Sequence, residues 1–343
     1  MSVFRPQDLT GFASALLEAA GYTSHHAART AEILVWADAR GASSHGVLRI
    51  PRYIEMIGEG MIHPVAEPVL TLRQGAAAVI DAHRAPGPSA MVAAIDTAVE
   101  LAADHGIGWC SAREITHAGA IGYYALRAAA AACIGIVMTA SGPLMAYHGS
   151  RVAGLSTNPL SIAVPTPDLP LLLDMSTSTA ALGKIMHARD TGSTIPANWA
   201  IDKAGAPTTD ATAAVTLTPL GGPKGSGLSL MIEVLCSVLV ANPAISTALS
   251  GKGSAMNGVA LAIRIDRFGN PDTFARHLTD LVTELKGLPL AAGTDRILMP
   301  GERGFRMAEE RRETGIPLAN GTVNRLMQVA DQFGLRLPDP LQT

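Results

Sequence analysis

The stretch IGWCSAREITHAGAIGYYALRAAAAACIGIVMTA, residues 107–140, predicts the architecture of the chain. Apolar runs at 107–112 and 134–140 indicate buried strands, and residues 123–132 between them indicate a helix. A strand, a loop, a helix and a second strand in this order are typical of an α/β or mixed sheet covered by helices. The first loop holds His117, Gly119 and Gly122, at the end of a strand where α/β sheets hold ligands.

The same alternation extends outward in both directions. Ser24 is expected to cap the second helix, and three short apolar runs before residue 113 and three after residue 159 read as strands. Helices are expected at 7–20, 24–40, 88–105, 177–187, 226–240, 273–285, 306–313 and 322–333. Further strands are expected at 69–72, 78–81, 160–164, 171–173 and 259–265.

Composition excludes several classes of protein. The chain has 343 residues, 48% of them hydrophobic and 16% charged, so it can bury a core and is not disordered. With 26 Lys+Arg against 29 Asp+Glu it lacks the basic excess of a nucleic-acid-binding protein. The length suggests about two domains.

Cysteine usage and apolar patterning indicate a reducing cytoplasm. Cys110, Cys133 and Cys236 lie far apart, which argues against a disulfide framework or a zinc site and favours three small core residues. Neither an apolar signal core at the start nor a span of about 20 apolar residues is present. No histidine and carboxylate spacing builds a metal site.

Both standard nucleotide fingerprints are absent. Gly106 and Gly108 lack the third glycine of G-x-G-x-x-G, and the order Pro223-Lys224-Gly225-Ser226 breaks a Walker A loop. A nucleotide, if bound, is therefore held in another way.

The segment SHGVLRIPRY, residues 44–53, concentrates groups that can carry chemistry. Arg49 can bind a carboxylate through two hydrogen bonds, and His45 can exchange a proton near neutral pH. A spacing of four would put His45, Arg49 and Tyr53 on one face of a helix, but Pro51 favours a helix that begins there, with His45 on the preceding loop. A loop that only caps the following helix remains an equal alternative.

Three further constellations are candidates for ligand binding. His117 is a candidate acid or base, although a locally hydrogen-bonded helix-start histidine explains it equally well. Asp174-Met175-Ser176-Thr177-Ser178 follows a strand and precedes an expected helix, whose N-terminus suits a phosphate or is simply capped. Residues 218–227 place Lys224 among four glycines, which favours an anion site.

Taken in order, these motifs resemble the type 2 malate/L-lactate dehydrogenases, also called the sulfolactate dehydrogenase-like oxidoreductases. The resemblance covers nearly the whole chain. The matching stretches are 37–41, 44–46 with Tyr53, 111–122, 141–143, 147–149, 157–160, Pro165, 174–178, 183–185, 207–210, 219–227, 300–302 and 315–318.

The resemblance implies a mixed α/β, non-Rossmann fold of the sulfolactate dehydrogenase type, which would account for the missing glycine fingerprint. It implies an N-terminal helical part, residues 1–113 with 307–343, around an NAD(P)-binding domain, residues 114–306. It also implies a cytoplasmic homodimer that acts on small 2-oxo or 2-hydroxy acids such as malate, lactate, sulfolactate or ureidoglycolate. Neither a nucleic acid nor a membrane is an expected partner.

Site residues are carried over position by position from the resemblance. His117 matches the proton donor or acceptor of the hydroxy-acid enzymes, Ser44 and His45 match the proton relay of an imine-reducing branch, and Arg49 matches the ligand of the substrate carboxylate, with Tyr53 beside it. The matching cofactor contacts are His117, Ala118, Gly119, Ala120, Ile121, Ser141, Asp174, Met175, Ser176, Lys224, Met299, Pro300, Gly301 and Glu302.

The chain departs from the family pattern in places. Ala118 stands where the family usually has an aromatic residue, and Gly149-Ser150 stands where it has two glycines. Lys184 stands where many imine reductases have an acid, although Asp190 could replace that acid. Arg151 and Arg189 are candidates for a 2′-phosphate, so the choice between NAD and NADP stays open.

Three functions therefore remain. The first is hydride transfer between NAD(P)H and C2 of a 2-oxo acid, with Arg49 on the carboxylate and His117 or His45 donating the proton. The second is reduction of a cyclic imino acid such as Δ1-piperideine- or Δ1-pyrroline-2-carboxylate, with Ser44 and His45 carrying the proton. The third is non-catalytic dinucleotide binding.

Overall fold

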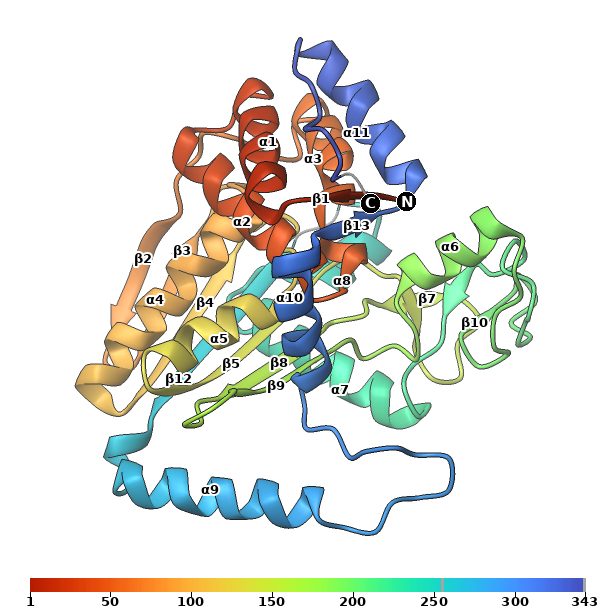
Figure 1. The fold of residues 1–343 in the computed structure, drawn as a ribbon. Coiled ribbons are helices and arrows are strands. Elements are labelled where there is room, and N and C mark those ends of the chain that lie inside the picture. Colours follow the sequence, from red (N-terminus) through yellow and green to blue (C-terminus); the bar gives the residue numbers. More distant parts are fainter. Residues whose placement is uncertain (254–255, 342–343) are drawn as a thin grey trace.

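A seven-stranded sheet forms the centre of the computed structural model, which describes residues 1–253 and 256–341 but not the side chains of His187 and Asp190 (Figure 1). In spatial order its strands are β2 (Val69–Gln74), β3 (Ala77–Asp81), β4 (Ile107–Arg113), β12 (Asn257–Arg264), β5 (Cys133–Ala140), β8 (Leu160–Val164) and β9 (Leu171–Met175). Strand β12 pairs antiparallel with both β4 and β5. The two strands of the opening stretch are therefore separated by a strand from far along the chain.

Helices α4 (Gly87–His105) and α5 (Gly122–Ala130) pack on this sheet at very short range. A Cβ placed on Gly108 of β4 would lie 1.9 Å from the carbonyl oxygen of Ala98, and one on Gly135 of β5 would lie 2.4 Å from that of Ala125. Because only glycine fits at these points, the scarcity of large side chains is what lets the helices approach the sheet.

A second core lies among the terminal helices (Figure 1). Helices α1 (Pro6–Ala19), α2 (Ser24–Ala39), α3 (Ile50–Gly58) and α11 (Asn320–Gln332) surround it, and β1 (Ser2–Phe4) pairs antiparallel with β13 (Ile316–Leu318). The two ends of the chain thus form one unit. The division into residues 1–113 with 307–343 and residues 114–306 stays a prediction.

A smaller third core lies beside the main sheet. It consists of the sheet β10-β11-β6-β7 and helix α6 (Leu182–Thr191), with strands at Ala200–Ile201, Thr216–Leu217, Met145–Ala146 and Ala153–Leu155. Helix α7 (Pro223–Glu233) continues through a π-helical turn (Val234–Val238), and α8 (Ala244–Leu249) follows.

An arm projects from the sheet. Helix α9 (Pro271–Lys286) has no buried residue, and Figure 1 shows it and the loop that follows running along one side of the molecule. The chain returns through α10 (Glu302–Thr314). Among the described residues, no helix is long and apolar enough to cross a membrane.

Most of the expected elements are present, and two local expectations are wrong. Thr23, not Ser24, caps α2, because its hydroxyl accepts the His26 N–H at 3.2 Å. The helix expected at 177–187 begins only at Leu182, so Ser176–Ser178 lie in a loop and not at a helix N-terminus. Cys110, Cys133 and Cys236 are buried free thiols, as expected.

Candidate functional site

The loop after β4 places His117 over the end of the sheet. A backbone N–H of Gly119 donates to its Nδ1 at 3.2 Å, and the Tyr53 hydroxyl lies 2.7 Å from the same nitrogen. An Nδ1 that accepts from a backbone N–H has no proton of its own, so neutral His117 carries its proton on Nε2. The ring therefore keeps a donor nitrogen for a bound molecule.

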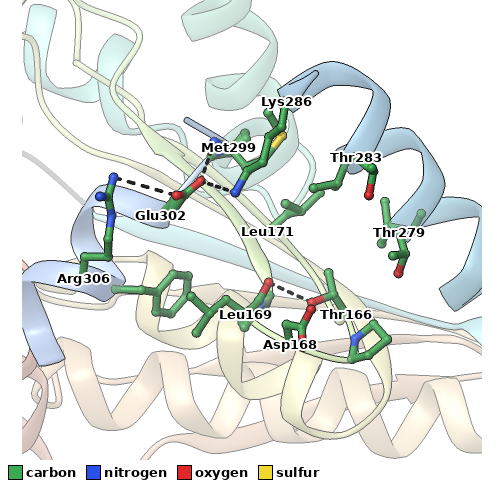
Figure 2. A pocket seen from close by; sticks show the side chains of 16 residues that line it. Thr166, Asp168, Leu169, Leu171, Thr279, Thr283, Lys286, Met299, Glu302 and Arg306 are labelled. Atoms are coloured by element: carbon green, nitrogen blue, oxygen red, sulfur yellow. Dashed lines mark hydrogen bonds and ion pairs between the residues drawn. The ribbon is translucent and has the colours of Figure 1, made fainter. Parts of the chain in front are cut away.

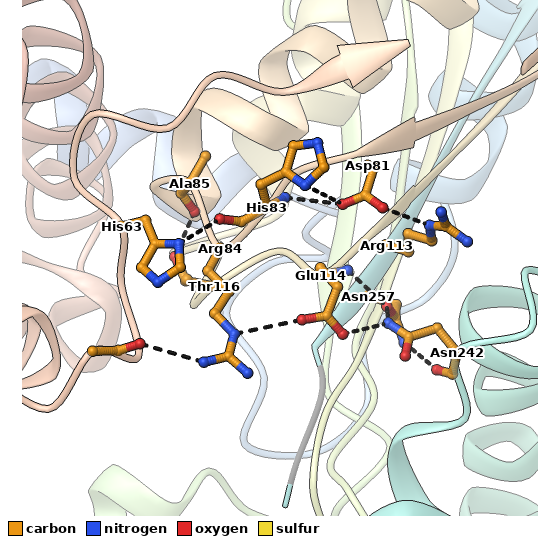
Figure 3. A network of polar contacts seen from close by, with 11 residues as sticks. His63, Asp81, His83, Arg84, Ala85, Arg113, Glu114, Thr116, Asn242 and Asn257 are labelled. Carbon is orange, nitrogen blue, oxygen red and sulfur yellow. Dashed lines mark hydrogen bonds and ion pairs between the residues drawn. The ribbon is translucent and has the colours of Figure 1, made fainter. Parts of the chain in front are cut away.

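A network of polar contacts holds this loop in place (Figure 3). The Thr116 hydroxyl donates to the carbonyl of Ala85 at 3.0 Å and accepts the N–H of Gly87 at 2.8 Å. A Cβ on Gly87 would lie 2.4 Å from the carbonyl oxygen of His117. The start of α4 thus presses directly on the histidine's backbone.

Left-handed backbone conformations occur in the same network. His83, Arg84 and Glu114 have φ of 50°, 60° and 53°, a region that costs a non-glycine residue free energy. Asp81 accepts the N–H of His83 at 3.0 Å, and Asn257 accepts that of Glu114 at 3.2 Å (Figure 3). Strain of this kind persists only where the surroundings impose it, which is typical of functional sites.

The segment with Ser44 approaches His117 from the terminal unit. It forms two short 3-10 turns, Ser43–His45 and Val47–Arg49, and then α3, with Pro51 in the first turn. It is therefore not one continuous helix, yet the rings of His45 and His117 stack with centroids 5.6 Å apart and planes 21° apart. The tertiary fold brings together Ser44, His45, Arg49, Tyr53 and His117.

Burial and one cation determine the charge of this histidine pair. Burial, and then the positive charge of Arg49, lower the pKa of His45 to about 4 and lower the pKa of His117 well below its ordinary value. Arg49 donates from Nε to the carbonyl of Ser44 at 2.7 Å, and no described carboxylate pairs with it. Both rings are therefore neutral at pH 7, beside a cation available to an anion.

Asp174, on β9, contacts the other end of the same loop. It accepts the N–H of Gly122 at 3.0 Å, and a Cβ on Gly122 would lie 2.6 Å from that oxygen. Desolvation raises the pKa of Asp174 to about 6, although the Gly122 N–H and the charge of Arg40 oppose the shift. Arg40 also donates to the carbonyl of Gly301 at 3.4 Å, which brings the turn 299–302 to this edge of the sheet.

The loop 118–121 offers its backbone rather than its side chains. Ala118, Ala120 and Ile121 are buried, and the Tyr124 hydroxyl donates to the carbonyl of Ala118. Gly119 has φ of 70°, which glycine adopts without strain. Any contact that these residues make with a cofactor must therefore come from main-chain atoms.

Lys224 and the Ser176 loop lie side by side. The N–H of Leu220 donates to the carbonyl of Thr177 at 2.9 Å, and Ser178 forms a β-bridge with Pro219. Lys224 is exposed in the first turn of α7, at the positive end of the helix dipole. Pro223 has no N–H, and the N–H groups of Gly225 and Ser226 donate to the carbonyls of Leu220 and Gly222, so the donors here are the ammonium and the N–H of Lys224. Ammonium, hydroxyl and N–H groups are donors that fit the phosphates of a dinucleotide.

The two remaining cofactor candidates, Ser141 and the turn 299–302, are held by contacts of their own. Ser141 shares a hydrogen bond of 2.7 Å with Ser156. Glu302 lies 2.9 Å from Lys286 and accepts the N–H of Met299 at 3.1 Å, which lowers its pKa. It borders a cavity of about 260 Å³ between α9 and residues 166–171 (Figure 2).

Sequence reasoning missed several residues of the site. Arg40 donates to the carbonyl of Gly301, and a Cβ on Gly183 would lie 3.0 Å from that of Ser44, so α6 begins beside the relay pair. The motif around residues 37–41 was a signal for Arg40, but Gly183 had none. Lys184 places its ammonium 5.4 Å from the centroid of the Trp199 ring, and Arg189 donates to the carbonyls of Ala211 and Ala214.

Comparison with known proteins identifies relatives along nearly the whole chain. The family described as malate/L-lactate dehydrogenase matches residues 4–327. A malate dehydrogenase of Pyrococcus horikoshii is 36% identical over 96% of this chain and 95% of its own length, and an NAD(+) ureidoglycolate dehydrogenase of Escherichia coli K12 is 36% identical over 82% and 83%.

Solved structures agree in fold. The malate dehydrogenase of Entamoeba histolytica superposes with a TM-score of 0.92 at 28% identity, over 98% of this chain and 99% of that one. The Δ1-piperideine-2-carboxylate reductase of Pseudomonas syringae gives a TM-score of 0.85 at 26% identity, over 96% and 100%.

Proposed function

Because this chain belongs to the malate/L-lactate dehydrogenase family, we propose that it transfers a hydride between a nicotinamide cofactor and C2 of a small 2-oxo or 2-hydroxy acid. One observation carries the assignment of the site: Arg49 donates to the carbonyl of Ser44 at 2.7 Å, next to the His45 ring, which stacks on His117 with centroids 5.6 Å apart. A carboxylate on Arg49 would therefore lie beside two imidazoles that can move a proton.

Arg49 binds and orients the substrate in this proposal. Its Nε is engaged by Ser44, so its terminal nitrogens would take the carboxylate. A bound carboxylate would neutralise the cation that helps to lower the pKa of both histidines. Substrate binding would thus raise both pKa values toward neutrality and prepare the pair for proton transfer.

The two histidines take different roles. The proton on Nε2 of His117 would hydrogen-bond the substrate oxygen and stabilise negative charge that develops there during reduction. The Ser44 hydroxyl lies 2.9 Å from Nδ1 of His45, and this pair would deliver the proton to that oxygen, or accept it during oxidation.

The cofactor residues are Lys224, Ser176, Asp174, Ser141 and the turn 299–302, together with the backbone of 117–121. When bound, the cofactor donates or accepts the hydride at C2. Lys224 and the first turn of α7 would hold its phosphates. The cofactor is NAD or NADP; Arg189 of α6 donates to the carbonyls of Ala211 and Ala214, so it contributes little to a 2′-phosphate site.

Reduction of a cyclic imino acid is a second candidate. The Ser44–His45 hydrogen bond and the fold shared with a Δ1-piperideine-2-carboxylate reductase favour it. Lys184, which faces Trp199, favours the oxo acid, and the side chain of Asp190 lies outside the described residues.

The test is a panel of 2-oxo acids and of Δ1-pyrroline-2-carboxylate with NADH and NADPH. Arg49→Ala should lose about 10²-fold or more of kcat/KM while NAD(P)H affinity is unchanged, because only the substrate carboxylate loses its partner. Arg52→Ala is the control, since Arg52 lies on α3, directly after Arg49, but pairs with the exposed Glu55 and Glu59.

An Arg49→Ala variant with unchanged kcat/KM would overturn the site. Imine turnover without oxo-acid turnover would select the second candidate. If the dinucleotide binds but no substrate is turned over, the protein is a non-catalytic dinucleotide-binding protein.

We also propose that the chain forms a homodimer. Leu228, Met231, Val234 and Val238 are 38–53% exposed and recur three or four residues apart, so they form one apolar stripe on α7 and its π-helical turn. The only charged side chain between Gly225 and Leu239, Glu233, is buried. A second copy presents the same uncharged stripe, as a two-fold contact requires.

Light scattering after size exclusion tests the dimer. Met231→Asp should yield monomers, because it places a charge within the stripe. Leu249→Asp, at an exposed position on α8, is the control. A Met231→Asp variant that stays dimeric would place the contact elsewhere.

A further inference from the structure

Asp38 is a buried carboxylate behind the segment that carries Ser44, His45 and Arg49. It lies in the last turn of α2 and is 2% exposed. Its Oδ2 accepts the backbone N–H of Val47 at 2.8 Å. Burial of an acidic side chain is costly unless it is hydrogen-bonded, so this contact is a specific feature of the fold.

Gly46 lies directly against the same carboxylate. A Cβ on Gly46 would lie 2.1 Å from Oδ1 and 2.2 Å from Oδ2, so only glycine fits there. Its φ of −90° is open to any residue, which leaves the approach of Asp38 as the reason for the glycine. Asp38 therefore contacts two successive residues, Gly46 from the side and Val47 through its N–H.

Gly46 and Val47 lie between the proposed proton carriers, Ser44 and His45, and Arg49, the proposed ligand of the substrate carboxylate. His45 precedes Gly46, and Arg49 follows Val47 by two positions. The N–H of Arg49 donates to the carbonyl of Gly46 at 3.0 Å. The second 3-10 turn therefore starts at the residue that the Asp38 carboxylate contacts. A shift of this point moves His45 and Arg49 relative to His117, which belongs to a different unit of the fold.

The chain around Asp38 is itself anchored. The N–H of Ala42 donates to the carbonyl of Ala37 at 2.8 Å, and Arg311 of α10 donates to the carbonyl of Asp38. The carboxylate is therefore a fixed reference on α2 for this turn.

We infer that Asp38 is a positioning residue for the proposed reaction: through Gly46 and the Val47 N–H it fixes the separation of His45 and Arg49 from His117. The inference rests on the proposed function for its catalytic consequence. A misplacement of about 1 Å in a catalytic group can cost about 10²-fold in rate, so one hydrogen bond suffices for a measurable effect.

The experiment compares four variants in the full chain. Asp38→Leu removes the acceptor and leaves the Val47 N–H buried without a partner, whereas Asp38→Asn keeps an oxygen that can accept it. Gly46→Ala disturbs the same contact from the opposite side. Thr30→Val is the control, because Thr30 is buried on the same helix and its hydroxyl has no partner among the described residues.

Two readouts are measured on each variant: kcat/KM together with NAD(P)H affinity, and hydrogen exchange of peptides that cover residues 44–49. For Asp38→Leu and Gly46→Ala we expect kcat/KM to fall about 10²-fold, NAD(P)H affinity to stay unchanged and exchange to accelerate. Asp38→Asn should restore kcat/KM to within about tenfold of wild type, and Thr30→Val should match wild type.

A folded Asp38→Leu protein with wild-type kcat/KM and exchange would overturn the inference, as would an Asp38→Asn protein as impaired as Asp38→Leu. If Asp38→Leu does not fold, Asp38→Ser, whose shorter side chain cannot reach Val47, takes its place. Wild-type protein without turnover would defeat the proposed function, whereas the exchange measurement would still test the contact.

Discussion

Burial shifts the pKa values of the histidine pair and of Asp174 in opposite directions, although both lie against the loop that begins at His117. Desolvation lowers the pKa of His45 to about 4 and raises that of Asp174 to about 6, so both groups are driven toward the neutral form. At the histidines, Arg49 adds to the effect of burial. At Asp174, Arg40 opposes it.

The difference between the two arginines is informative. Arg40 is engaged already: it donates to the Gly301 carbonyl and lies over the rings of Trp36 and Phe305. Arg49 makes one hydrogen bond to Ser44 and pairs with no described carboxylate. Arg40 thus stabilises the fold itself, whereas the charge of Arg49 is available to bind a substrate.

The largest expected effect is the loss of an imidazole. His117→Gln and His45→Gln should each lower kcat by about 10²–10⁴-fold, the usual range for a positioned acid or base, without weakening NAD(P)H binding by a comparable factor. His63→Gln is the control, because His63 is exposed and bonds only the carbonyl of His83 among the described residues. Turnover unchanged in both site variants would remove the histidine pair from the mechanism.

A smaller effect, on the pKa of His45, distinguishes Arg49 from Arg40. Arg49→Met should raise the pKa of His45 from about 4 toward its ordinary 6.5, because one of the two causes of the shift is removed. The imidazole proton signals, followed by NMR as pH is varied, measure it in the free protein. Saturating acetate should shift the wild-type pKa in the same direction, and Arg40→Met should leave it unchanged. If neither Arg49→Met nor acetate changed the pKa of His45, the electrostatic coupling between Arg49 and His45 would be contradicted.

The smallest effect concerns stability at Asp174. Its pKa is higher in the folded state, about 6, than its ordinary 3.8, so folding binds a proton there. Its contribution to the free energy of unfolding is therefore complete below about pH 3.8 and is lost as pH rises through 6. Asp174→Asn should have a higher Tm than wild type at pH 7.5, and the difference should shrink at pH 5. If the Tm difference between Asp174→Asn and wild type grew as the pH was lowered, the direction of the Asp174 pKa shift would be wrong.

Local pattern was enough for most of the helices and strands. The alternation in 107–140 predicted β4, α5 and β5 because apolar periodicity reports local burial. The late start of α6 was missed, since the hydroxyl-rich residues 176–178 resemble a helix cap but bond to each other in a loop.

The sequence by itself determined that His117 follows a strand on a glycine-containing loop, that Ser44, His45 and Arg49 lie in one short segment, and that no standard nucleotide fingerprint exists. The tertiary structure alone decided that Tyr53 reaches His117 at 2.7 Å, that β12 separates β4 from β5, and that Arg40 meets Gly301 from 261 residues away. Hydrophobic periodicity indicates which face of a helix or strand is buried, but not which other element packs against that face. Strand pairing and contacts between distant side chains depend on the relative placement of elements, and only the folded chain specifies that placement.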